Sequence, residues 1–110
     1  MQHWDLRAIA APRGTRDPYV VHQDEGARAV LVSIDAGQAL GEHQVKENAW
    51  VVVVHGTVEV GAGSQKVELG PGGLVRFEPG ERHSLSSPEG ARVLLVLTPW
   101  PGAGHYAAAV

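Results

Sequence analysis

Short valine-rich segments, each bounded by Gly, Pro, Asp or Asn, follow one another along most of this chain with only one to six residues between them. Apolar and polar residues alternate in several of them, which is typical of β-strands with one buried face. Connections this short leave no room for the helices that join parallel strands. The pattern therefore predicts an all-β antiparallel sandwich or barrel, with strands at 19–22, 27–34, 41–45, 50–55, 57–61, 65–69, 74–78, 83–87 and 91–98.

The length of 110 residues allows one domain with a modest core and is too short for two. Residues 1–18 contain two prolines, a glycine and few apolar anchors, so we expect an N-terminal arm. The barrel is expected to span residues 19–100. Residues 101–110 are mostly small and are expected to form a C-terminal tail.

Several classes of function are excluded or disfavoured by composition. The absence of cysteine excludes disulfides, thiolate zinc sites and iron–sulfur clusters. The net charge of -3, with Lys and Arg scattered singly, provides no basic face, so nucleic acid is not an expected partner. The sequence has no apolar run of about 20 residues and no signal-like N-terminus, so we expect a cytoplasmic protein that does not enter a membrane. No organic cofactor is indicated.

His43 and His83 are the candidate functional residues that stand out. They lie forty residues apart, each in a segment framed by glycines. An antiparallel barrel can bring two such side chains together at its mouth. Neutral imidazole is the commonest protein ligand for transition metals, so this pair predicts a metal site.

The spacing around both histidines resembles the two motifs of a small single-domain cupin of the bacterial type, over residues 27–98. In the first motif, Gly37, His43 and Gly56 stand at the family's positions. Val45 and Ala49 replace the second histidine and the glutamate of that motif. The first motif therefore retains one of its three metal ligands.

The second cupin motif is carried by Gly72, Gly80 and His83, while Glu78 and Ser87 replace its proline and asparagine. The resemblance implies a double-stranded β-helix, or jelly-roll barrel, whose mouth often holds a divalent metal on three histidines and one glutamate. It also implies a homodimer in which sheets or arms pack together.

Glu47 is the candidate that could replace the missing carboxylate. If the strand continued beyond His43, then Val45 and Glu47 would share its face, because side chains two residues apart point the same way. An inward fold of residues 46–48 would then give a set of two histidines and one carboxylate, suited to iron, manganese, nickel or zinc. The alternative is that Glu47 lies in a solvated turn of Lys46, Glu47 and Asn48.

Without metal, His43 and His83 could bind an organic carboxylate or amide, or be hydrogen-bonded to backbone. Three functions follow: a metal-dependent enzyme of oxygenase or isomerase type acting on a small organic molecule, a metal-free small-molecule binding module, or a structural or regulatory protein. We prefer the first. Individual catalytic residues are not identified. On the strand at 74–78, we expect Arg76 and Glu78 to face outward and Val75 and Phe77 to face inward.

Overall fold

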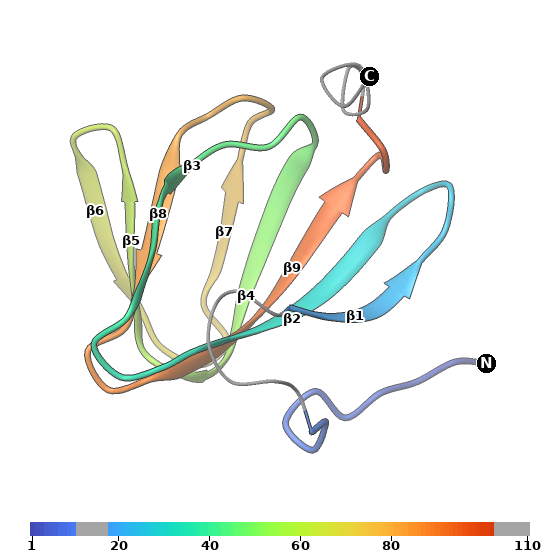
Figure 1. Ribbon diagram of the computed structural model, residues 1–110, viewed down its shortest axis with the longest axis horizontal. Coiled ribbons are helices and arrows are strands. Elements are labelled where there is room, and N and C mark those ends of the chain that lie inside the picture. Colours follow the sequence, from blue (N-terminus) through green and yellow to red (C-terminus); the bar gives the residue numbers. More distant parts are fainter. Residues whose placement is uncertain (11–17, 103–110) are drawn as a thin grey trace.

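The computed structural model describes residues 1–10 and 18–102, with only the backbone described for residues 41–43. Its described residues form nine β-strands and no helix, as the sequence predicts (Figure 1). The strands are β1 (Tyr19–Gln23), β2 (Arg28–Ile34), β3 (Ala39–His43), β4 (Asn48–Gly56), β5 (Val58–Ala62), β6 (Gln65–Leu69), β7 (Leu74–Phe77), β8 (His83–Ser86) and β9 (Ala91–Thr98).

The strands form two antiparallel sheets that face each other. One has five strands in the order β1-β2-β9-β4-β7, and the other has four in the order β3-β8-β5-β6. Because most neighbours in each sheet are not consecutive in the chain, apart from the hairpins β1–β2 and β5–β6, the sheets form a jelly roll rather than a simple meander. This confirms the predicted all-β fold.

Inward-facing side chains of both sheets form one core. On β4 the alternating residues Ala49, Val51 and Val53 are buried, and on β5 Val58 and Val60 are buried. The alternation is what a sheet with one covered face requires. The core therefore forms where valines of the two sheets meet.

The side chains of β7 point in the predicted directions. Phe77 is buried in the core, whereas Arg76 is exposed and forms an ion pair with Glu78, with 2.9 Å between Nη1 and Oε1. Arg76 also donates to Asn48 and lies over the Trp50 ring. The expectation that Arg76 and Glu78 lie outside the barrel is confirmed.

The third strand differs from its prediction. It was expected at 41–45 but runs from Ala39 to His43, and the next strand begins two residues early, at Asn48. Gly37 turns the chain with a φ of 78° and donates its N–H to the Ser87 carbonyl, which starts the β3–β8 pairing early. Residues 44–47 are therefore a connection between strands.

Both ends of the chain contact the barrel where they are described. Arg92 Nη1 donates to the carbonyls of Leu6, Arg7 and Ile9 in the N-terminal arm. Trp100, beyond the last strand, is buried beneath the guanidinium of Arg28. From residue 103 onward, the expected tail lies outside the described residues.

No helix long and apolar enough to cross a membrane occurs in residues 1–10 and 18–102.

Candidate functional site

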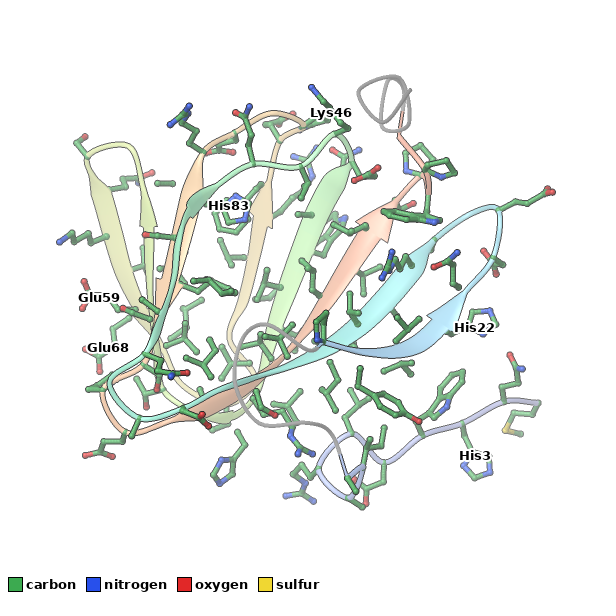
Figure 2. The ribbon with its side chains drawn as sticks, viewed as in Figure 1. His3, His22, Lys46, Glu59, Glu68 and His83 are labelled. Atoms are coloured by element: carbon green, nitrogen blue, oxygen red, sulfur yellow. The ribbon has the colours of Figure 1, made fainter. Side chains whose placement is uncertain are left out.

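His83 begins β8 and points into the space between the two sheets (Figure 2). Its exposed fraction is only 2%, and its ring stacks face to face on Phe77, with 3.9 Å between ring centroids and 7° between ring planes. His83 Nδ1 lies 3.0 Å from the carbonyl oxygen of Glu81. The ring is therefore fixed in both position and rotation.

The contact with Glu81 also determines the tautomer of a neutral His83. A carbonyl oxygen can only accept, so Nδ1 must carry the hydrogen. Nε2 then carries the lone pair. Histidines that bind metals commonly donate their other ring nitrogen to a backbone carbonyl in this way, and the bond orients the ring.

The backbone register places His43 directly opposite His83 in the β3–β8 ladder, after an irregularity that follows Leu40. The two motif loops also meet, because the Gly80 N–H donates to the Val45 carbonyl at 2.8 Å. The two histidine positions, forty residues apart in sequence, are thus brought together at one end of the barrel. The side chain of His43 lies outside the described part of the structure.

Glu47 does not lie in a solvated turn. It is 1% exposed, and its Oε2 accepts a hydrogen bond of 2.7 Å from the backbone N–H of Gly102. The prediction that a longer strand would place Glu47 on the same face as His43 was also wrong, because the strand ends at His43. Glu47 is buried because the connection between β3 and β4 folds inward and the chain after β9 covers it.

The other substituted motif positions have structural roles. Ala49 is completely buried in the core, paired in β4 with Phe77 and Leu97. Ser87 is buried as well, and its hydroxyl donates to the Thr57 carbonyl at 2.7 Å. A methyl group and a hydrogen-bonded hydroxyl therefore occupy positions where cupin motifs carry polar residues.

No group of three His, Asp or Glu side chains arranged to hold a metal is found among the residues whose side chains are described. His43 is not among those residues. The metal set of His43, His83 and Glu47 therefore stays a prediction.

Sequence reasoning missed three residues that shape this end of the barrel. Phe77 supports the His83 ring, Glu81 orients it through a backbone carbonyl, and Gly102 contacts Glu47. Of these three residues, only Phe77 left a signal in the sequence, because the alternation of side chains along its strand predicts that it faces inward. The other two contacts depend on backbone atoms, which leave no signal in side-chain identity.

The family model for the cupin domain matches residues 30–98, more than half of the chain. The chain belongs to the cupin family. No protein with a curated description matches this cupin.

Solved structures agree with this assignment. This cupin is 26% identical to TT1209 from Thermus thermophilus, with a TM-score of 0.76, and the match covers 90% of this chain and 98% of that one. It is 25% identical to KdgF from Halomonas sp., with a TM-score of 0.70 and coverage of 76% and 79%. The DMSP lyase DddQ from Ruegeria pomeroyi DSS-3 is 22% identical over 68% of this cupin and 39% of the lyase, with a TM-score of 0.65, which shows a shared fold.

Proposed function

We propose that this cupin is a metal-dependent enzyme that acts on a small organic molecule, with oxygenase or isomerase chemistry, at the barrel end that carries His43 and His83. The observation that carries the proposal is the state of His83. It is buried, stacked on Phe77, and hydrogen-bonded through Nδ1, so that Nε2 carries the lone pair of a neutral ring. The fold of the lyase DddQ supports the idea that such a barrel can house an enzyme.

The donor set fits a divalent transition metal. The ligands would be His43 and His83, which are paired in the ladder, with Glu47 as the third. The bond that Glu47 accepts from Gly102 does not by itself prevent a metal contact, because a carboxylate has about four lone-pair sites. Any of iron, manganese, nickel or zinc would polarise a substrate oxygen, and a redox-active metal, which zinc is not, would also activate dioxygen. Phe77 and the Glu81 carbonyl hold the His83 ring in a fixed orientation for either role.

Metal content tests this proposal. We would measure it by inductively coupled plasma mass spectrometry on untagged protein after reconstitution with each of the four metals. Near-stoichiometric metal is expected in the wild type and in the control His55→Ala, whose side chain is exposed. It should be lost in His43→Ala and His83→Ala and reduced in Glu47→Gln. Absence of metal from reconstituted wild type refutes the enzyme proposal and favours the metal-free binding module.

We also propose that the cupin forms a homodimer through the outer face of the five-stranded sheet. The register places Trp50 beside Val96, and Val52 beside both Leu94 and Leu74. Trp50 and Leu74 are 37% and 56% exposed. An apolar strip of this kind, bordered by Arg76 beside Trp50, is typical of an interface, and a twofold axis would pair it with the same face of a second copy.

The dimer is tested by light scattering during size exclusion. A dimer is expected at micromolar concentration, and Leu74→Asp is expected to give a monomer, while Val67→Asp, at an exposed position of the other sheet, leaves the dimer intact. A monomeric wild type refutes the interface. The cytoplasmic location stays a prediction.

A further inference from the structure

A cavity of about 460 Å³ lies apart from the candidate site, and His83 is not among its lining residues. Its lining residues lie where β2 and β4 end and β9 begins, which is the end of the barrel opposite the start of β8 (Figure 1). Arg7 of the N-terminal arm also lines it. Its volume lies within the range of small-molecule sites, about 300 to 1,000 Å³. Its polar lining consists of Arg7, Ser33, Asp35, His55, Glu89 and Arg92.

The charges around this cavity are balanced but separated. The lining includes two guanidinium groups, of Arg7 and Arg92, and two carboxylates, of Asp35 and Glu89, so its formal charge is zero when His55 is neutral. Among the residues that the structure describes, none of these four groups forms an ion pair with another. The lining therefore presents both signs of charge to whatever enters.

The fold explains why the opposite charges do not pair. Arg92, at the start of β9, is held by the arm, since its Nη1 contacts the carbonyls of Leu6 and Ile9 at 2.9 Å and 2.8 Å. Asp35 follows the last residue of β2, and Glu89 lies in the turn before β9, so the backbone fixes where each carboxylate starts. In the described structure Arg92 uses Nη1 alone for its contacts with the arm, which leaves Nη2 and Nε for a ligand.

We infer that this cavity binds a small zwitterion, a molecule with one ammonium group and one carboxylate. The ammonium group binds Asp35 and Glu89, and the carboxylate binds Arg7 and Arg92, because an arginine fork matches the two oxygens of a carboxylate. A ligand with a single charge would satisfy one side of the cavity and leave the other uncompensated. A zwitterion satisfies both and keeps the net charge of the complex at zero.

The test is a titration of ¹⁵N-labelled protein followed by NMR. The probes are glycine, β-alanine, 4-aminobutyrate and 6-aminohexanoate, which span a range of charge separations, together with butyrate and butylamine, which each carry one of the two charges. At least one zwitterion should shift the amide signals of Ser33, Asp35 and Gly90 and bind at least tenfold more tightly than butyrate or butylamine. Equal binding of a single-charge probe, or no shift with any of the four zwitterions at roughly 20 mM, about twentyfold above a Kd of 1 mM, overturns the inference.

Substitutions assign the two charges. Asp35→Asn and Glu89→Gln should weaken zwitterion binding at least fivefold, and Arg7→Gln should do the same through the carboxylate. Glu25→Gln, at an exposed position in the β1–β2 turn, is the control and should leave binding unchanged. His83→Ala should also leave it unchanged, which separates this site from the proposed metal site. Unchanged binding in all three cavity variants overturns the assignment.

Discussion

Gly56 offers a quantitative test of the packing between β4 and the turn before β9. Its φ is 78°, and a Cβ added there would overlap the carbonyl oxygen of Gly90 and lie 2.9 Å from Ala91 Cα. Both obstacles are backbone atoms, which cannot rotate away. Left-handed backbone costs a residue with a Cβ about 1–2 kcal/mol, and overpacking adds roughly 1–3 kcal/mol. Gly56→Ala should therefore lower the free energy of unfolding by about 2–5 kcal/mol.

Two other glycines separate these contributions. Gly37 has the same φ of 78°, but nothing lies within 4 Å of its added Cβ, so Gly37→Ala should cost only the backbone contribution of about 1–2 kcal/mol. Gly70 has open space and no left-handed φ, so Gly70→Ala should be neutral or stabilising by up to about 1 kcal/mol.

The assay is urea unfolding followed by tryptophan fluorescence. With a slope of about 1–2 kcal/mol/M for a domain of this size, Gly56→Ala should lower the midpoint by roughly 1–5 M and Gly37→Ala by roughly 0.5–2 M. If Gly56→Ala unfolds in water, all variants are compared in the same concentration of a stabilising osmolyte. Equal midpoints for Gly56→Ala and Gly37→Ala would refute the close approach to Gly90.

Three further predictions concern single side chains. Glu47→Ala should lower the free energy of unfolding by about 1.5–3 kcal/mol, because the buried carboxylate that accepts the Gly102 N–H is lost. Glu47→Gln should lower it by less than half as much in the same urea assay. Equal decreases would contradict a hydrogen-bonding role for Glu47. The backbone N–H groups of Gly26 and Ala27, and then His22, hold the pKa of Asp24 below its ordinary value of 3.8. The stabilisation that this turn provides is therefore present above pH 3.8 and is lost as the pH falls through the lower pKa of the folded state. An NMR titration of the carboxyl carbon checks this, and a midpoint at or above 3.8 would count against it. Arg92→Gln should free the N-terminal arm and speed tryptic cleavage after Arg7, detected by mass spectrometry, whereas Arg76→Gln should leave that rate unchanged.

The strand pattern could be derived from sequence because it depends on local chemistry. Valines at alternate positions and glycines at the turns indicate which face of a strand is buried, and the inward position of Phe77 and the outward position of Arg76 followed from parity. The third strand was misplaced because its start depends on a long-range bond, from the Gly37 N–H to the Ser87 carbonyl. No local preference signals such a bond.

The candidate site was likewise predictable from the sequence only in part. The glycine and histidine spacing identified His43 and His83 and the cupin fold, and the register of β3 with β8 places the two positions opposite each other. The burial of Glu47 could not be predicted, since a Lys-Glu-Asn string is usually solvated and its partner Gly102 lies fifty-five residues away. The charges of the cavity at the opposite end of the barrel likewise come from three segments, at Arg7, Asp35 and residues 89–92, that only the tertiary structure brings together. The sequence determined the strands and their buried faces, because these depend on residues that are neighbours in the chain. The tertiary structure decided which polar groups meet, because that depends on the strand register and on which distant segments the fold brings into contact.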